Sequence, residues 1–477
     1  MTLFFSKRTV ATAGLPWLAL LLFVIFAIAV LLPIQPNDYW WYVRLGQDIQ
    51  QNLSIPTVDS YSHTRAGQPI VYHSWLSALL FALFQQIGGN TLTVLARAIL
   101  LLLFYLSIWF TCRLAGAGPR LAALVTLLAA LAGSNNWAMR PQLFSYPLFG
   151  LSLYLLWQWQ GGKEAKSIWL LPLIVFFWVN LHGAYALIFL LAGAALVGGG
   201  GNRRRLALVI GAMGVASLLN PRLGGAWSYV LTLLTDAPSQ QLGAEWSPPT
   251  PQSWQGALFF AWLLLMIPLA AYSPARLLWT QWLWLLGFGW MALIGLRYGV
   301  WFLAILAPVT AQLLAPLVGR WLDRQNRGYP AVDITFASIL LLLPLLALPG
   351  LREKWWGQAP PVLTSDTPVE AVIWLRTQPR LPGPIWHDLT FSSYLIYALP
   401  ERPVWIDTRF ELYPLQHWER YTAIVEAAPG WHASLNEDKI GLLILSPGRQ
   451  ARLVTALQGA PAWQEVYHDD TAIIFSR

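Results

Sequence analysis

The stretch PNDYWWYVRLGQDI, just after the first long apolar run, places an acidic side chain beside a cluster of aromatic rings. Asp38 is followed directly by Tyr39, Trp40 and Trp41, and Arg44 comes shortly afterwards. A carboxylate can take part in acid–base chemistry, and amphipathic rings suit the boundary between a membrane and water. Asp38 is therefore a candidate catalytic residue, and the rings and Arg44 are candidate substrate contacts. The alternative is that Asp38 caps a helix that starts near Tyr39.

The same region, residues 34–91, contains further polar side chains that could take part in chemistry. Asp59, in IPTVDSYSHT, is either a turn-forming residue or a second catalytic carboxylate. His73 is a candidate substrate contact. His63 and His73 are ten residues apart, which is not the spacing of a metal site, so hydrogen bonding within the loop is the alternative for both.

Five more polar residues interrupt or border later apolar runs. All five are candidate substrate contacts: Arg140 in RPQLFS, His182 in NLHG, Arg222 in NPRLGG, Glu245 in AEWSPP and Arg297 in GLRYG. A guanidinium group pairs bidentately with phosphate oxygens, so Arg140 and Arg297, with His182, are candidate contacts for a phosphate ester. Two arginines that share one phosphate should lie within about 10 Å of each other. The alternative is that these arginines extend to lipid headgroups.

The composition identifies the elements that must position these residues. The chain has 477 residues, of which 56% are hydrophobic and 11% charged, whereas about a quarter of a soluble protein is charged. This composition predicts a polytopic α-helical membrane protein. The net charge of +8 does not indicate nucleic-acid binding, because such chains collect Lys and Arg in cytoplasmic loops. The single cysteine, Cys112, excludes an internal disulfide framework.

The distribution of Lys and Arg predicts the topology. Lys7 and Arg8, with the loops at 163–166, 202–205 and 319–328, should be cytoplasmic. The run at 15–32 is followed by no small-residue cleavage site, so we interpret it as a retained anchor. The short stretch WLSALLFALFQQIGG does not suffice to cross a membrane, and we expect it to form a juxtamembrane helix within the first outer loop, 34–91. The result is about eleven transmembrane helices with a cytoplasmic N-terminus.

Residues 1–350 should therefore form the transmembrane domain, and the last span, at 331–348, delivers the tail to the outside. The tail, 351–477, has the pattern of an extracytoplasmic α/β domain. PVEAVIWLRTQ and SSYLIYALP are helix-like, whereas PIWHDL, RPVWIDT and KIGLLILS are strand-like. WQEVYHDDTAIIFSR has the pattern of a terminal hairpin.

This layout resembles the GT-C fold glycosyltransferases, multispanning enzymes that use lipid-phosphate-linked sugars at the outer face of a membrane. Asp38 in NDYWWYVRLGQDI stands at the position of their first-loop acidic residue, and the stretch is similar to the first loop of oligosaccharyltransferase catalytic subunits. HSWLSALLFALFQQIGG is similar to the juxtamembrane helix of aminoarabinose and mannosyl transferases. The chain resembles a group of bacterial multispanning membrane proteins more closely, because it has the same short motifs in the same order. In this sequence the motifs are DYWWYVRLG, PTVDSYSHT, HSWLS, RPQLFS, NLHG, LNPRLG, EWSPP and WIDTRFELY.

The resemblance implies transfer of a sugar from a polyprenyl-phosphate donor to an acceptor at the outer face of the cytoplasmic (inner) membrane. It implies that Asp38 is the base that deprotonates the acceptor, and that the aromatic rings after it stack on the sugar or lie along the lipid chain. The sequence does not determine whether the acceptor is a glycan, a lipid or a protein. The second outer loop, SNNWAMRPQ, lacks the second acidic pair of metal-dependent members, so no cofactor is expected and a divalent metal would lack those ligands.

Two other function classes compete with this interpretation. A non-catalytic GT-C-like scaffold subunit would present the outer domain within a membrane complex. A lipid or polysaccharide transporter would place charges at the bilayer midplane, often with related halves. The chain instead has its charges at the boundaries of apolar runs and no repeated half, which disfavours the transporter.

Overall fold

The computed structural model describes residues 14–162, 166–322 and 329–477. Lys7, Arg8 and most of the predicted cytoplasmic loops at 163–166 and 319–328 lie outside these residues. The chain forms two compact units. The helical unit comprises the chain up to Leu32, Gly88–Trp227 and Ala244–Pro360, and the mixed unit comprises Pro33–Ile87, Ser228–Gly243 and Pro361–Arg477.

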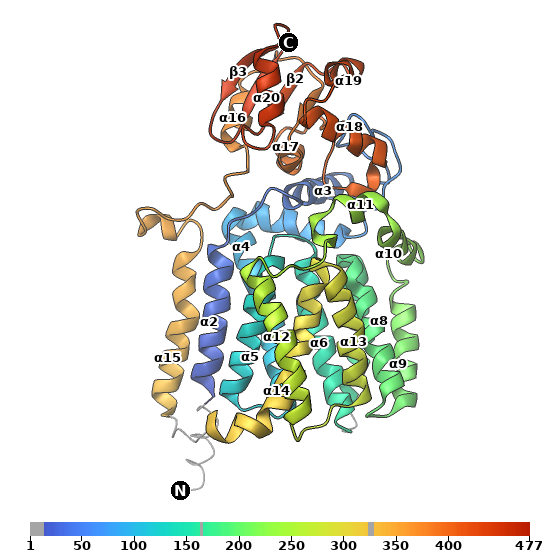
Figure 1. Ribbon diagram of the computed structural model, residues 1–477, viewed down its shortest axis with the longest axis vertical. Helices are drawn as coiled ribbons and strands as arrows, with labels where there is room; N and C mark the ends of the chain where they lie inside the picture. The colour runs from blue at the N-terminus through green and yellow to red at the C-terminus, as the bar shows by residue number, and fades with distance from the viewer. Residues whose placement is uncertain (1–13, 163–165, 323–328) are drawn as a thin grey trace. The chain divides into compact units, whose positions relative to one another are not determined.

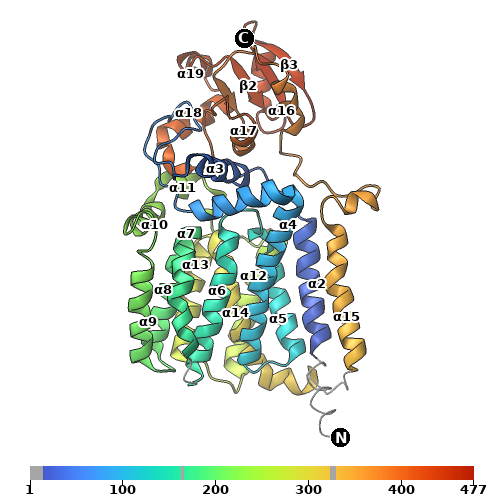
Figure 2. The same ribbon diagram turned by 180° about the vertical axis from the view of Figure 1, so that it is seen from behind.

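The helical unit is a bundle of apolar helices that run side by side (Figures 1 and 2). Its helices are α2 (Leu15–Leu31), the C-terminal part of α4 (Trp75–Leu114), α5 (Pro119–Ala132), α6 (Gln142–Gln160), α7 (Leu171–Leu181), α8 (Ala186–Gly198), α9 (Arg203–Ala216), α12 (Trp254–Tyr272), α13 (Trp279–Ile294), α14 (Gly299–Leu322) and α15 (Pro330–Leu342). Short 3-10 helices connect them: η1 (Ser134–Asn136), η2 (Lys166–Leu170), η3 (Gly183–Tyr185), η4 (Ala244–Trp246), η5 (Leu296–Tyr298), η6 (Leu343–Ala347) and η7 (Arg352–Lys354).

Among the described residues, four helical segments are long and apolar enough to cross a membrane: Trp75–Leu114, Trp254–Tyr272, Leu296–Gly319 and Pro330–Ala347. The last of these agrees with the predicted span at 331–348. Shorter apolar helices accompany them, and the count of about eleven spans stays a prediction.

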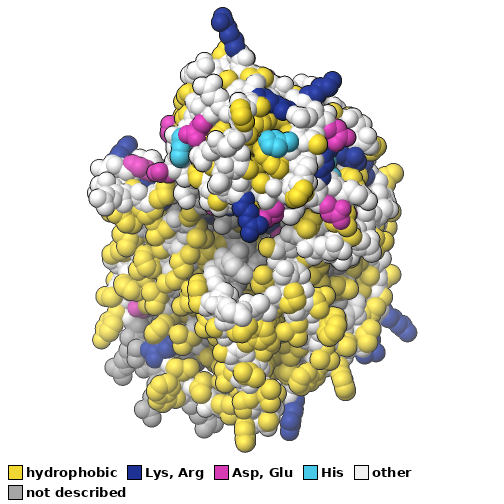
Figure 3. All heavy atoms as spheres, turned by 45° about the horizontal axis from the view of Figure 1, so that its top comes forward, with side chains coloured by type: hydrophobic (Ala, Val, Ile, Leu, Met, Phe, Trp, Pro, Cys, Tyr) yellow, Lys and Arg dark blue, Asp and Glu magenta, His cyan; other side chains and the backbone are white. Residues whose placement is uncertain are grey.

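Large apolar side chains on this unit face outward. Leu264 and Ile267 on α12 are 67% and 69% exposed, and Leu286 and Trp290 on α13 are 67% and 68% exposed. Figure 3 shows hydrophobic side chains over most of the visible surface of these helices, with few charges among them. Such a continuous apolar surface is unfavourable in water and suits contact with lipid chains.

Two buried arginines donate hydrogen bonds to the backbone carbonyl groups at the C-terminal end of α2. Arg97, on α4, donates from Nε and Nη2 to the carbonyl of Ala29, at 3.1 and 2.8 Å, and also to that of Leu32. Arg352 donates to the carbonyl of Val30 at 3.4 Å. The last carbonyls of a helix lack partners within the helix and carry partial negative charge, so two cations stabilise this end.

Helix α4 consists of two segments, because the backbone at Gly89 is not helical. Its φ of +56° and ψ of −147° lie in a region that residues with a side chain rarely adopt. The break falls at the end of the stretch WLSALLFALFQQIGG, which confirms the predicted separation of this stretch from the following span. The division between the two compact units also falls there, after Ile87.

The mixed unit is built around a four-stranded sheet with the order β1 (Ile385–His387), β2 (Leu442–Leu445), β4 (Ile473–Ser476) and β3 (Gln464–His468). β1 is parallel to β2, whereas β4 is antiparallel to both β2 and β3. The unit also contains α3 (Tyr39–Asn52), the first segment of α4, most of α10 (Gly225–Thr235), α11 (Ala237–Leu242), α16 (Val369–Arg376), η8 (Leu389–Phe391), α17 (Ser392–Ala398), η9 (Phe410–Leu412), α18 (Leu415–Val425), α19 (Trp431–Glu437) and α20 (Ala451–Gln458).

The α/β prediction for the tail is confirmed, with one correction. RPVWIDT is not a strand of the sheet. Instead, Val404 forms an isolated bridge with Ser62, and its N–H donates to the carbonyl of Tyr61 at 2.9 Å. The tail thus folds together with the first predicted outer loop, because this segment pairs with residues far earlier in the chain.

Candidate functional site

In the helical unit, three of the predicted residues form one ionic cluster. Arg140 precedes α6, Glu245 lies on η4, and Arg297 lies on η5, between α13 and α14. Arg140 Nη1 is 2.5 Å from Glu245 Oε2, and Arg297 Nη1 is 3.2 Å from Glu245 Oε1. Because both guanidinium groups contact one carboxylate, they lie closer together than the about 10 Å expected for a shared phosphate.

Local structure holds this cluster in place. The N–H of Leu296, next to Arg297, donates to the carbonyl of Ser247 at 2.9 Å, which joins η5 to the segment after Glu245. The Arg297 guanidinium lies over the Trp246 ring, 4.3 Å from its centroid. This cation–π contact and the backbone bond orient Arg297 toward the carboxylate.

The cluster carries two cations for one anion. Burial alone would raise the pKa of Glu245, but the guanidinium groups of Arg297 and Arg140 outweigh it and hold the pKa below its usual value. Glu245 is therefore ionised at neutral pH. The side chains of Arg140, Arg297 and Glu245 are 29%, 18% and 34% exposed, so an outside anion can reach them. A carboxylate between two arginines occupies the kind of position that a phosphate group would take.

His182 and Arg222 lie in turns of the helical unit. His182 ends α7, and its Nδ1 accepts a hydrogen bond from the N–H of Ala184 at 3.3 Å and lies 3.0 Å from Ser145 Oγ. Ser145 in turn accepts a hydrogen bond from the Trp178 indole at 2.7 Å. Arg222 lies in a turn after α9, where its N–H donates to Asn220 Oδ1 at 2.8 Å. The predicted phosphate role of His182 and the substrate role of Arg222 stay predictions.

In the mixed unit, Asp38 stands directly before α3, as the sequence predicts. Within the described residues its carboxylate makes no capping hydrogen bond to that helix. Its Oδ1 instead accepts a hydrogen bond from Thr408 Oγ1 at 2.6 Å. The half-buried carboxylate is therefore held by the tail of the protein, and the capping alternative is wrong.

The three aromatic residues after Asp38 are buried, with exposed fractions of 0%, 2% and 6%. Trp40 packs against Tyr394 and Tyr397, with centroid distances of 5.3 and 4.9 Å. Trp41 stacks on its neighbour Tyr42 and donates its backbone N–H to Ser393 Oγ at 3.0 Å. The Tyr39 hydroxyl donates to Gln85. These contacts dock α3 on α17 and on the first segment of α4, so the rings pack within the unit, and their predicted contact with substrate stays a prediction.

Asp59 has a structural role as well. It accepts hydrogen bonds from the backbone N–H groups of Tyr61 and Ser62, which form a turn, and its Oδ1 is 2.7 Å from Arg409 Nη1. Arg409 also pairs with Asp407 at 2.5 Å. All three charged side chains are almost fully buried. The oxygens of Asp59 are thus engaged in the turn and in the ion pair, and its predicted catalytic role stays a prediction.

The buried Arg409 cluster includes two tyrosines. The Tyr72 hydroxyl accepts from Arg409 at 2.8 Å, and the Tyr413 hydroxyl donates to Asp407 at 2.8 Å. Burial opposes ionisation of Asp407, but Arg409 outweighs it and holds the pKa of Asp407 below its usual value. A buried charge set of this kind is stable only when every member is paired. It fixes the position of Thr408, the residue that contacts Asp38.

His73 belongs to a second set of contacts in the mixed unit. Its ring stacks on Tyr229 with centroids 4.2 Å apart, and the Tyr229 hydroxyl donates to Glu411 Oε1 at 2.9 Å. Burial raises the pKa of Glu411, which makes this carboxyl a candidate proton donor. Sequence reasoning missed Thr408, Arg409 and Glu411, although the polar run in WIDTRFELY was a signal for them.

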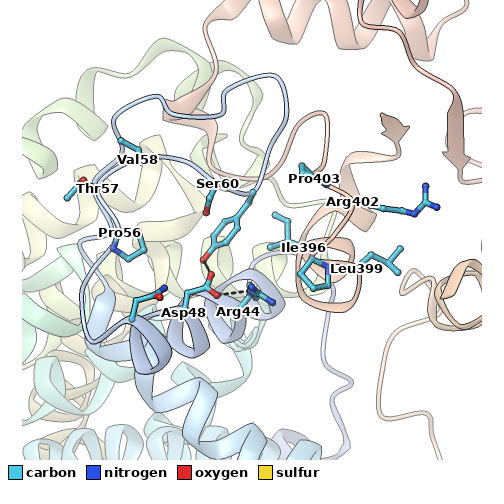
Figure 4. Close-up of a pocket in the computed structure, with 13 residues that line it drawn as sticks. Arg44, Asp48, Pro56, Thr57, Val58, Ser60, Ile396, Leu399, Arg402 and Pro403 are labelled. Atoms are coloured by element: carbon cyan, nitrogen blue, oxygen red, sulfur yellow. Dashed lines mark hydrogen bonds and ion pairs between the residues drawn. The ribbon is translucent and has the colours of Figure 1, made fainter. Parts of the chain in front are cut away.

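Arg44 lines a pocket of about 350 Å³ within the mixed unit (Figure 4). Arg44 Nε is 2.9 Å from Asp48 Oδ1, and the Tyr61 hydroxyl donates to Asp48 Oδ2 at 2.7 Å. The opposite wall comes from the segment around Leu399 and Arg402. With both hydrogen-bond donors and acceptors beside apolar proline rings, the pocket suits a polyhydroxylated ligand.

No group of three or more His, Cys, Asp or Glu side chains suited to a metal ion occurs in the described part of the chain.

No family model matches the chain, and no curated protein matches its sequence. Solved structures are similar. They include the oligosaccharyltransferase AglB from Archaeoglobus fulgidus, in complex with an inhibitory peptide and a dolichol-phosphate, with a TM-score of 0.58 and 12% identity over 90% of this chain and 69% of that one.

ArnT from Cupriavidus metallidurans has a TM-score of 0.50 and 16% identity over 95% of this chain and 96% of that one. The mycobacterial arabinofuranosyltransferase AftD has a TM-score of 0.59 and 15% identity, over 96% of this chain but only 41% of that one. At such identities the similarity is one of fold. The chain has the fold of the GT-C glycosyltransferases, as its sequence signatures predict.

Proposed function

We propose that the protein is a membrane glycosyltransferase that moves a sugar from a polyprenyl-phosphate-linked donor to an acceptor at the outer face of the cytoplasmic membrane. The observation that carries this proposal is the convergence of Arg140 and Arg297 on one carboxylate. The shared fold supports it, and AglB, one of the similar proteins, was solved with a dolichol-phosphate, a lipid phosphate of the same chemical class.

The proposed donor site is the pair of arginines. The donor phosphate replaces Glu245 between the two guanidinium groups, which then bind phosphate oxygens through charge-assisted hydrogen bonds. When the bond from the sugar carbon to the phosphate oxygen breaks, negative charge grows on the leaving phosphate. The same two cations stabilise that charge more strongly than they stabilise the bound donor, and this difference lowers the barrier.

The proposed base is Asp38 in the mixed unit. Its carboxylate takes the proton of an acceptor hydroxyl as the oxygen attacks the sugar carbon. The hydrogen bond from Thr408 at 2.6 Å fixes the orientation of this carboxylate. Thr408 is thus a positioning residue, and the buried Arg409 cluster holds it. No step of this scheme runs through a metal.

The proposal is tested with purified protein in lipid nanodiscs and polyprenyl-phosphate sugars as donors. Release of free polyprenyl phosphate, followed by mass spectrometry, reports turnover. Asp38→Asn should lower turnover about 100-fold while donor binding persists, because only the proton transfer is lost. Asp470→Asn, at an exposed position of the same unit, is the matched control and should leave turnover unchanged.

A full rate for Asp38→Asn would remove the mechanism. If wild-type protein binds these donors but never releases the lipid phosphate, a scaffold subunit with a GT-C fold explains the chain better.

A further inference from the structure

A cavity of about 490 Å³ lies in the helical unit where several helices end. It is separate from the Arg140–Glu245–Arg297 cluster and shares no residue with it. The side chains that matter for its chemistry are Trp157, Gln158, Gln160, Arg276, Gln281 and Gln312. Four glutamine amides around one cavity make it polar at the boundary of an otherwise apolar bundle.

Gln160, the last residue of α6, is the unusual member of this set. It is only 6% exposed, and neither its amide nitrogen nor its amide oxygen has a hydrogen-bond partner among the described residues. On one side the backbone of Gly200 lies against it, so closely that a Cβ there would come within 3.0 Å of the Gln160 Cα. A buried amide without hydrogen-bond partners is energetically unfavourable. A polar group of a ligand in the cavity would satisfy the Gln160 amide.

Two of the other three glutamine amides, those of Gln281 and Gln312, are held in place by hydrogen bonds within the protein. Gln281 Nε2 donates to Gln312 Oε1 at 2.8 Å, and Gln312 Nε2 donates to the carbonyl of Arg276 at 3.0 Å. The N–H of Leu278 donates to Gln281 Oε1 at 2.9 Å. Because these bonds already orient the two amides, a ligand meets preorganised groups, which reduces the entropy lost on binding.

Exposed side chains near Arg276 in the sequence, and two leucines of the lining, indicate an amphipathic ligand. Tyr272 and Trp279 flank the segment that carries Arg276, and they are 81% and 75% exposed. Exposed aromatic rings at the ends of apolar helices are typical of the interface between membrane and water. Leu114 and Leu278, which line the cavity, are 41% and 42% exposed and offer apolar surface to acyl chains.

We propose that this cavity binds the headgroup of an anionic glycerophospholipid that carries free hydroxyl groups. Arg276 pairs with the phosphate. A hydroxyl group both donates and accepts, so the headgroup hydroxyls satisfy the oxygen and the nitrogen of the Gln160 amide at once. The acyl chains lie along the exposed leucines. This proposal is independent of the sugar-transfer reaction.

Thermal unfolding of detergent-purified protein tests the proposal. Phosphatidylglycerol, with a phosphate and two free hydroxyls, should raise the Tm by about 2–4 °C. Phosphatidylcholine should not raise the Tm, because its headgroup has no free hydroxyl and its choline cation neutralises the phosphate. Gln160→Leu should abolish the shift while its Tm without lipid is at least that of wild type, since it removes two unpaired buried groups. Arg276→Gln, at an exposed position, should reduce the shift without affecting folding.

Gln252→Leu, at an exposed position outside the cavity, is the matched control and should keep the full shift. An equal shift with phosphatidylcholine would overturn the headgroup assignment. An equal shift with soluble glycerol 3-phosphate would show a site for a free phosphate ester instead of a lipid. If both Gln160→Leu and Arg276→Gln keep the full response to phosphatidylglycerol, the cavity is not the binding site.

Discussion

Glu245 should act as an internal competitor of the donor phosphate, and Glu245→Gln tests this directly. The wild-type carboxylate contacts Arg140 at 2.5 Å and Arg297 at 3.2 Å. At about 4 Å between charge centres and an effective dielectric constant of about 20, each attraction is about 4 kcal/mol before desolvation. The three side chains are partly exposed, and solvent screening reduces the net value of the cluster to about 1–2 kcal/mol.

Two opposite effects follow from this value. Glu245→Gln should lower the free energy of unfolding by about 1–2 kcal/mol, because two cations lose their counter-ion. The same change should tighten binding of a lipid monophosphate about tenfold, because about 1.4 kcal/mol of competition is removed. Binding of fluorescent polyprenyl phosphate to protein in nanodiscs measures the affinity, and denaturant titration measures the stability. Arg140→Gln and Arg297→Gln should weaken the binding.

A matched control is available in the same unit. Glu353 pairs with Arg352 at 3.4 Å and is 45% exposed, so Glu353→Gln should leave the lipid-phosphate affinity unchanged. If Glu245→Gln weakens binding or leaves it unchanged, the phosphate does not replace the carboxylate and the donor site is elsewhere.

Acid titration adds an independent check on the same cluster. Burial opposes ionisation of Glu245, but the arginines hold its pKa below the ordinary 4.5. A carboxyl group with a lowered pKa in the folded state stabilises the protein above its ordinary pKa, and this contribution is lost as the pH falls through the lowered value. The stability difference between wild type and Glu245→Gln should therefore be constant near neutral pH and disappear in acid below pH 4.5.

Four further predictions concern the rest of the chain. Arg409→Met should destabilise the mixed unit by about 3–5 kcal/mol in denaturant titrations, because two buried carboxylates lose their cation. Thr408→Val should lower turnover about tenfold and shift the pH–rate profile, with Thr408→Ser restoring both, since only the hydroxyl orients Asp38. Burial lowers the pKa values of His387 and His417 to about 4, so each histidine should lower the stability by about 1.4 kcal/mol per pH unit from pH 6.5 down to pH 4, and a flat profile in urea titrations would contradict this. Reporter fusions at Gly201 and at the C-terminus should report opposite sides of the membrane, and equal locations would refute the topology.

Much of the architecture could be predicted from the sequence, because it depends on local patterns. Long apolar runs predict helices with a surface that suits lipid. Short apolar runs in the tail predict its strands. The break at Gly89 agrees with the short length of the apolar stretch before it, from which a separate juxtamembrane helix was predicted. The GT-C fold followed from the order of short signatures along the chain, and the similar solved structures support it.

Only the tertiary structure decided which polar residues meet. Arg140, Glu245 and Arg297 lie far apart in the sequence, and their shared ion pairs exist because loops from different helices end at one place. The sequence likewise did not predict which side chains are buried. Trp40 was a candidate substrate contact, but in the structure its ring packs against α17.

The same reason explains Asp59 and Thr408. A carboxylate in a polar loop has the same local sequence whether it faces water or a buried arginine, and only the docking of WIDTRFELY on the first loop settles the choice. Local sequence fixes periodicity and hydrophobicity. The partners of a charge depend on contacts across hundreds of residues, and those contacts form only when the chain folds.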